Sequence, residues 1–221
     1  MKLHLLLCGS VLMTAFVAQA GPVLTTGTPG DANLATPSGP SIVLGNLINF
    51  DSTSSCTSSP CPSLALGNAT FSSPDTLSVI PYSTQSYPNE LYDNGTSGTQ
   101  DGVANLTIKL NGGTTAIAVG IADSDAVTVY VQALNSAGAV FGTQFALTIP
   151  ENTVNPGNGY YEISDTTPDI YGLLITQPVS SLGNYSGLAI DDVQSTPEPS
   201  SYLLLTSGAA LLFALRKRKR A

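Results

Sequence analysis

Hydrophobic and polar residues alternate along the middle of the chain in a pattern typical of β-strands. Between Val127 and Ala133 every second residue is apolar, as expected of a strand that buries one face. No helical spacing of apolar residues persists beyond two turns anywhere between residues 21 and 195. The pattern predicts strands over Ile42–Phe50, Leu106–Leu110, Ala116–Ala122, Val127–Leu134, Ala139–Ile149, Ile170–Thr176 and Leu188–Val193.

Residues with strong turn chemistry separate several of these runs. They cluster at Asn111–Gly113, Asp123–Asp125, Asn135–Gly138 and Asn155–Gly159. Short strands punctuated by turns predict an all-β fold, a single antiparallel β-sandwich of jelly-roll type over residues 41–195. That length is adequate for one hydrophobic core. Residues 21–40 are expected to form an irregular lead-in, and a helix is expected at each end of the chain.

The first twenty residues have the features of a secretory signal peptide. Leu5–Val17 is largely apolar, and Ala18 and Ala20 form a small-x-small cleavage site before Gly21. We therefore expect residues 1–20 to be a signal helix that is removed after Ala20. An uncleaved anchor is the alternative, but this run is short for a membrane span. A lipid anchor on Cys8 is disfavoured because the apolar stretch before it is very short.

The last residues, 196–221, combine a polar linker, a short apolar segment and a basic cluster. Tyr202–Leu215 would reach about 21 Å as a helix, against a hydrocarbon core of about 30 Å. The basic cluster predicts a cytoplasmic end, because topology follows the placement of Lys and Arg. A permanent anchor is the alternative, and an amphipathic surface helix is disfavoured because no polar face is present. The basic residues are Arg216, Lys217, Arg218, Lys219 and Arg220.

The linker contains Pro197, Glu198 and Pro199, and the order of all three parts resembles the PEP-CTERM sorting signal of exosortase substrates in Gram-negative bacteria. Each proline fixes its own backbone and biases the preceding residue to extended geometry, which suits a recognition element. The resemblance implies an exported protein, held in the inner membrane by the short helix until an exosortase-type transpeptidase, a cysteine enzyme of that membrane, acts near the motif. Such proteins usually reach the cell surface or the extracellular matrix.

Charge is divided unevenly along the chain. The net charge is -8, but residues 21–195 hold fourteen acidic residues and one basic residue, Lys109, which gives a net charge of -13. Such a body repels phosphate backbones, so nucleic acid is excluded as a partner. The one histidine, His4, lies in the predicted signal peptide. The mature protein would therefore lack an imidazole for a catalytic triad or a metal site.

Two cysteines remain in the predicted mature chain. Cys56 and Cys61 stand close together in a loop rich in serine and proline. In an exported protein this arrangement predicts a disulfide, and closing so short a loop contributes about 2 kcal/mol. A redox-active pair is the alternative, but four residues separate these cysteines where such pairs usually have two.

Three acidic places could do more than keep the body soluble. They hold Asp51, Asp123 with Asp125, and Asp191 with Asp192. The early and late places resemble the paired edge strands of jelly-roll carbohydrate-binding modules, and this resemblance implies a structural calcium ion. No EF-hand loop follows Asp123. The alternative is that these aspartates cap strands and keep sheet edges soluble.

We expect a structural protein of the surface or extracellular matrix and not an enzyme, because nucleophilic and phosphoryl-transfer motifs are absent from the sequence. The sequence predicts no catalytic or cofactor-binding residue. A carbohydrate-binding module for exopolysaccharide is the alternative, and a carboxylate-dependent glycoside hydrolase is a third reading. Tyrosines could provide stacking faces for a glycan or could equally belong to rim and core. They are Tyr82, Tyr87, Tyr92, Tyr160, Tyr161 and Tyr171.

Overall fold

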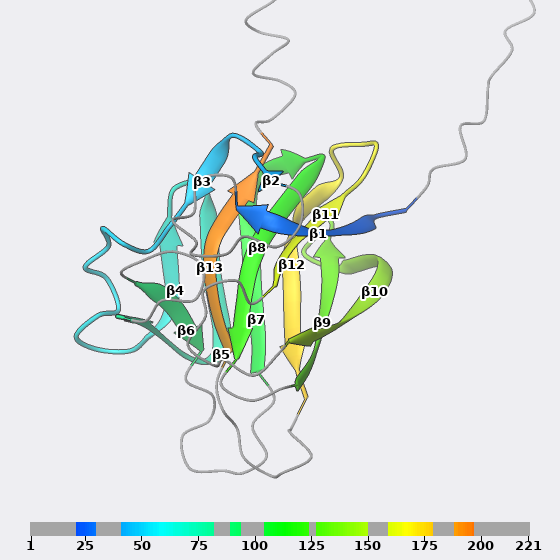
Figure 1. Cartoon of the computed structure of the whole chain (residues 1–221). Coiled ribbons are helices and arrows are strands. Elements are labelled where there is room, and N and C mark those ends of the chain that lie inside the picture. Colours follow the sequence, from blue (N-terminus) through cyan, green and yellow to red (C-terminus); the bar gives the residue numbers. More distant parts are fainter. Residues whose placement is uncertain are drawn as a thin grey trace, which may run out of the picture.

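In the computed structural model, the described part of the chain contains β-strands and no helix (Figure 1). The described ranges are 21–29, 41–81, 89–93, 104–123, 127–149, 159–178 and 188–196. The strands are β1 (Val23–Pro29), β2 (Ser41–Ile42), β3 (Asn46–Ile48), β4 (Cys61–Leu66), β5 (Ala69–Ile80), β6 (Glu90–Asp93), β7 (Ala104–Thr114), β8 (Ala116–Asp123), β9 (Val127–Leu134), β10 (Val140–Ile149), β11 (Tyr160–Ser164), β12 (Ile170–Gln177) and β13 (Leu188–Ser195). The all-β prediction is confirmed. The two predicted flanking helices lie outside the described residues.

The strands form one continuous path that curves round a shared core. Its order is β10-β9-β12-β7-β5-β6-β13-β8-β11-β1-β2, with β4 added to β5 and β3 added to β13. Apart from the short β1–β2 pair, which is parallel, the pairs are antiparallel. In Figure 1, β13 and β8 pass in front of β7 and β12. The body is therefore an antiparallel sandwich of two layers, as predicted.

Two of the places where the chain passes between the layers lie within β5 and between β7 and β8. Within β5, Ala69–Ser72 pair with β7, whereas Leu77–Ile80 pair with β6. Pro74 lies between these halves and is exposed, and proline interrupts a ladder because it has no N–H to donate. The second crossing is Thr115, the single residue between β7 and β8.

One large hydrophobic cluster fills the space between the layers. Phe50 and Phe71 meet there edge to face, with ring centroids 5.2 Å apart. Ile108 and Leu173 contribute from one layer and Ile190 from the other, all without solvent exposure. Burial of such apolar side chains is the main favourable term in folding. Because strands of both layers share this cluster, the two layers form a single packing unit.

Residues 42–44, at the end of β2, lie over the outer face of β13. All eight residues of β13 are buried. The Gln194 side chain holds the segment: its Nε2 donates to the Ile42 carbonyl at 3.3 Å, and its Oε1 accepts from the Leu44 N–H at 3.0 Å. Ile42 also packs with Ala118 and Tyr160 in a small second cluster. Ile42 still pairs with Pro29 in β2, but residues 43–45 belong to no ladder, so the single strand predicted over Ile42–Phe50 is in fact two, β2 and β3.

The other predicted strands coincide with all or part of β7, β8, β9, β10, β12 and β13, except that Ala139 lies one residue before β10. The turn predicted at Asn135–Gly138 is confirmed, because the Asn135 N–H donates to the Ala139 carbonyl at 2.9 Å. The turn predicted at Asn111–Gly113 is wrong, because β7 continues to Thr114. There the Asn111 N–H donates to the Asn68 carbonyl, and Thr114 pairs with Ile170. Neighbouring backbone groups thus override the local turn preference.

The irregular lead-in predicted for residues 21–40 is wrong for Val23–Pro29, which form β1 and pair with β11. The segment shows little hydrophobic signal because it lies near the margin of the sheet, and the Val23 side chain is 55% exposed. Pairing with an existing strand, rather than burial of its own side chains, makes it a strand. Residues 30–40 lie outside the described part of the chain.

We expect Gly172→Ala to lower the free energy of unfolding by about 3 kcal/mol or more, or to prevent folding. Gly172 has a φ of 153° at an irregularity between β12 and β7, and an added Cβ would lie 1.9 Å from the Ile108 carbonyl oxygen. Gly138→Ala is the matched control: its φ is 75°, but its Cβ would meet nothing within 4 Å. It should cost only about 1 kcal/mol. Equal urea midpoints for the two variants would contradict the expected clash.

Burial raises the pKa of Tyr161, whose side chain is only 8% exposed. The unfolded chain releases its tyrosine protons near pH 10, so the folded state holds this proton more tightly. The resulting stability is fully present below about pH 10 and is lost as pH rises through the higher folded pKa. In an alkaline absorbance titration, the folded protein should show a late phase that Tyr161→Phe removes. Persistence of that phase in the variant would assign it to another residue.

Candidate functional site

Most of the predicted sorting and processing residues lie outside the described part of the chain. These are Ala18, Ala20, Pro197, Glu198, Pro199 and the basic residues from Arg216 to Arg220. Thr196, the residue before the Pro-Glu-Pro motif, is described and contacts the body. The point at which the tail leaves the body is therefore the part of the sorting region that the structure defines.

Thr196 is bound to the junction of β7 and β8 through its backbone and its side chain. Its N–H donates to the Ala116 carbonyl at 3.1 Å. Its hydroxyl oxygen accepts from the N–H groups of Thr115 at 3.2 Å and of Ala116 at 3.3 Å, and lies 3.0 Å from the Thr115 hydroxyl. These contacts fix the residue on a stretch of backbone that crosses between the layers.

Thr114 completes this cluster from its buried position at the end of β7. Its hydroxyl oxygen lies 3.0 Å from the Thr196 carbonyl and 2.9 Å from the Ala116 carbonyl, and it also contacts the Thr196 hydroxyl. Because one hydroxyl donates a single hydrogen, Thr114 can serve only one of these acceptors at a time. We call Thr114, Thr115, Ala116 and Thr196 the tail clamp.

The strand register explains why the tail leaves the body at this place. Ser195 pairs with Ile117, and Gln194 pairs with Ala118, so the end of β13 lies beside the start of β8. Thr196 is the next residue and meets the crossing at Thr115. Figure 1 shows the end of the orange strand β13, and the residues after Thr196 lie outside the described part of the chain. Sequence reasoning missed the clamp because three of its residues are some eighty positions from the tail.

Asp51 links the chain after β3 to the chain before β6 through hydrogen bonds with Asn89. β3 and β6 both pair with β13, through Val193↔Ile48 and Ile190↔Leu91. Asp51 Oδ1 accepts from the Asn89 N–H at 3.1 Å, and Asn89 Nδ2 donates to the Asp51 carbonyl at 3.1 Å. Asp51 therefore acts as a cap that ties the chain after β3 to the chain before β6.

Asp191 and Asp192 form an irregularity in β13 and are buried. Asp191 pairs with Gly120 and Gln194 with Ala118, so β13 has one residue more than β8 between these pairs, as in a β-bulge. Asp192 has a φ of 47°, a conformation that aspartate tolerates better than most residues. Asp191 Oδ1 accepts from the Asp192 N–H at 2.8 Å, and the Tyr160 hydroxyl donates to the Asp192 carbonyl at 2.6 Å.

Of the remaining calcium candidates, Asp123 alone is described, and it forms no metal-binding group with the residues above. Asp123 pairs with Leu188 at the start of β13, whereas the bulge lies in the middle of that strand, and Asp125 lies outside the described residues. In the described ranges no group of three acidic, histidine or cysteine side chains is arranged to hold a metal ion. Asp51, Asp191 and Asp192 make the capping and bulge contacts given above.

Two buried acids were missed by sequence reasoning. Glu90 and Asp93 both lie in β6, and Asp93 Oδ2 accepts from the Ser73 hydroxyl at 2.9 Å. Nothing in the local sequence distinguishes them from exposed acids, since their burial follows from β6 lying between β5 and β13. They are enclosed in the fold and not displayed on its surface.

Two of the predicted stacking tyrosines belong to the interior. Tyr160 and Tyr161 are 1% and 8% exposed. Tyr92 and Tyr171 are half-buried, and Tyr82 and Tyr87 lie outside the described residues. The exposed large hydrophobic side chains in the described ranges are aliphatic: Val23, Val43, Leu47 and Val140. The described surface therefore presents no strongly exposed aromatic platform for a sugar ring.

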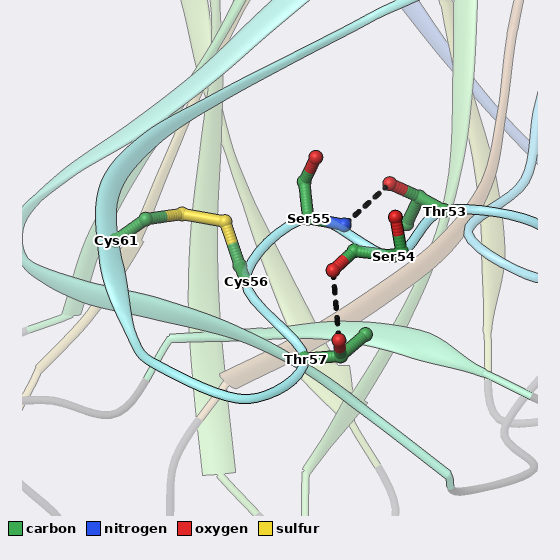
Figure 2. Close-up of a disulfide and its surroundings, with 6 residues drawn as sticks. All are labelled: Thr53, Ser54, Ser55, Cys56, Thr57 and Cys61. Atoms are coloured by element: carbon green, nitrogen blue, oxygen red, sulfur yellow. Dashed lines mark hydrogen bonds between the residues drawn. A yellow bond between two sulfur atoms is a disulfide. The ribbon is translucent and has the colours of Figure 1, made fainter.

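The predicted disulfide between Cys56 and Cys61 is present, with Cα atoms 5.5 Å apart (Figure 2). Within the same loop the Ser55 N–H donates to the Thr53 hydroxyl at 3.2 Å, and the Thr57 hydroxyl donates to the Ser54 carbonyl at 2.8 Å. The Val79 N–H donates to the Cys56 carbonyl at 3.1 Å, which ties the loop to β5. The bridge therefore holds a surface loop against the sandwich.

Comparison with known families identifies the tail. Residues 195–219 match the PEP-CTERM protein-sorting motif, which confirms the resemblance seen in the sequence. The motif implies export of the protein and C-terminal anchoring in a membrane before processing. No helix in the described ranges is long and apolar enough to cross a membrane. No curated protein matches the chain in sequence.

Several solved structures are distantly similar to the chain. The enzymatically active domain of tailspike protein 4 from bacteriophage CBA120 is 22% identical, with 59% of this chain and 19% of that chain covered and a TM-score of 0.37. The arabinose-bound α-L-arabinofuranosidase MgGH51 is 14% identical, with 66% and 25% covered and a TM-score of 0.38. The family 29 carbohydrate-binding module CBM29_1 from Piromyces equi is 10% identical, with 85% and 99% covered and a TM-score of 0.32. The chain thus spans at most a quarter of the first two, and at such TM-scores none supports an argument about function.

We expect replacement of both Cys56 and Cys61 by alanine to lower the free energy of unfolding by about 2 kcal/mol, because the open loop regains conformational freedom in the unfolded state. The measurement is the urea midpoint of the oxidised protein and of the double variant. Ser58→Ala, at an exposed position in the same loop, is the control and should stay within about 0.5 kcal/mol of the unaltered protein. Equal midpoints for the double variant and the control would show that the bridge contributes nothing.

Proposed function

We propose that this protein is an exported structural component of the cell surface or extracellular matrix, and that an exosortase-type transpeptidase of the inner membrane processes its C-terminus. The observation that carries the proposal is the match of residues 195–219 to the PEP-CTERM protein-sorting motif. The predicted signal peptide, residues 1–20, supplies the export step.

Each part of the tail has a physical role in this proposal. The short apolar segment Tyr202–Leu215 holds the exported chain in the membrane. The basic cluster that begins at Arg216 stays on the cytoplasmic side, because moving several charges across a bilayer is costly. Pro197, Glu198 and Pro199 then lie on the outer side, between the membrane and the body, where the transpeptidase would recognise them.

The described body supports a structural role more than a catalytic one. Its acidic residues at the bulge and in β6 are buried, and hydrogen bonds such as that from Asp192 N–H to Asp191 engage them within the fold. The strong negative charge of residues 21–195 favours solubility in a hydrated matrix. Binding of exopolysaccharide and hydrolysis by a carboxylate pair stay predictions of the sequence, and no described surface favours them.

Replacing Glu198 by glutamine should leave the unprocessed protein in the membrane fraction, because the recognition element loses its negative charge while the shape of the side chain is kept. The measurement is an immunoblot of membrane, surface and medium fractions from cells that contain the exosortase-type enzyme. Glu162→Gln in β11 makes the same change in the body and should be processed like the unaltered protein. Normal processing of Glu198→Gln would contradict the proposed function.

A further inference from the structure

The structure assigns the tail clamp a role in choosing the bond that is processed. We propose that Thr196, held by Thr114, Thr115 and Ala116, is a positioning residue: the pairing of β13 shields the peptide bonds of that strand, the clamp shields the Thr196–Pro197 bond, and processing takes place after Pro197. The inference rests on the proposed function, because it concerns the same C-terminal reaction.

The bonds before Thr196 are shielded by the sheet. Ser195 pairs with Ile117 and Gln194 with Ala118, and both residues are buried. The Thr196 N–H is donated to the Ala116 carbonyl. A transpeptidase must draw its substrate backbone out as a separate extended strand, and these groups are already engaged in the body. Cleavage at or before Ser195–Thr196 would require β13 to detach from β8.

The next bond, Thr196–Pro197, is shielded by Thr114. Its carbonyl oxygen is that of Thr196, which lies 3.0 Å from the Thr114 hydroxyl, and Thr114 is 2% exposed. For cleavage, a nucleophile must reach the Thr196 carbonyl carbon, and the Thr196 carbonyl oxygen must move to the hydrogen-bond donors that stabilise the oxyanion in the enzyme. The contact with Thr114 and the bonds to the Thr196 hydroxyl oppose that movement.

The chain available to the enzyme is short. From Thr196 to the predicted membrane segment at Tyr202 there are six residue steps, which reach about 21 Å when fully extended. One end is held by the clamp and the other by the membrane, and the two prolines restrict the backbone between them. The clamp thereby gives the enzyme one defined stretch of chain, with Pro197 as its first residue.

The reaction in this stretch is an acyl transfer. The enzyme's cysteine thiolate attacks the carbonyl carbon of Pro197 or of a later residue, a thioester to the body forms, and the peptide bond to the next residue breaks. The released amine stays on the membrane segment and takes up a proton. An acceptor amine or water then attacks the thioester and displaces the thiolate, so the mature body ends at Pro197 or beyond.

The test is the intact mass of the processed protein from cells that contain the exosortase-type enzyme. The unaltered chain should give a single product whose C-terminal residue is Pro197 or a later one. A product that ends at Thr196 or earlier would overturn the inference. Glu198→Gln, measured in parallel, reports on the proposed function alone.

Variants of the clamp test the role of the hydroxyls. Thr196→Val, alone and with Thr114→Val, keeps the side-chain shape but removes the hydroxyl contacts. We expect part of the product to end at residue 196 or earlier. Thr196→Ser keeps the hydroxyl and should restore the single product. Thr176→Val is the matched control, because it removes a threonine bond, to Asn105 at the other end of β7. It should be processed normally.

The thermal midpoint of each full-length variant separates shielding from general destabilisation. If Thr196→Val and the double variant give the same product and rate as the unaltered chain, the clamp has no positioning role, even where Glu198→Gln blocks processing. If Thr176→Val lowers the midpoint as much as Thr196→Val and gives the same shorter products, general loosening of the body explains them and the inference fails. A chain that is not processed at all would contradict the proposed function and this inference together.

Discussion

The pairing of β13 with β8 is the interaction on which the rest of the structure depends. β13 is buried along its whole length, with β8 along one edge and β6 and β3 in succession along the other. A strand enclosed in this way must satisfy its backbone groups within the sheet, because water cannot reach them. The same pairing places Thr196 against Thr115, so it decides where the sorting tail leaves the body.

The irregularity at Asp191 and Asp192 shows how a polar pair can stabilise a bulge within a buried strand. The added residue in β13 requires a backbone conformation that few residues other than glycine adopt, and Asp192 adopts it with a φ of 47°. Hydrogen bonds from the Asp192 N–H and the Tyr160 hydroxyl then hold the bulge. The position of these two carboxylates therefore follows from the geometry of the strand that contains them.

Sequence reasoning predicted the strands that have a strong apolar pattern and missed those that lack one. β7, β8, β9, β10, β12 and β13 contain continuous or alternating apolar residues, and each was predicted near its true position. β1, β4, β5, β6 and β11 were not predicted. The middle of β5 reads Ser72-Ser73-Pro74-Asp75, which is typical of a loop, yet the strand continues because β7 pairs with its first half and β6 with its second. Such strands form because adjacent strands pair with them, and their own sequences show little of the apolar pattern typical of a strand.

The sequence by itself determined the features that act locally. The sorting motif is a linear signal, and the Cys56–Cys61 bridge joins residues five positions apart, so both could be identified without a structure. Only the tertiary structure decided which acids are buried, which tyrosines belong to the interior, and how the tail is attached. Those properties depend on residues far apart in the chain, such as Thr114 and Thr196, and hydrogen bonds between them form only when the strand register brings them together.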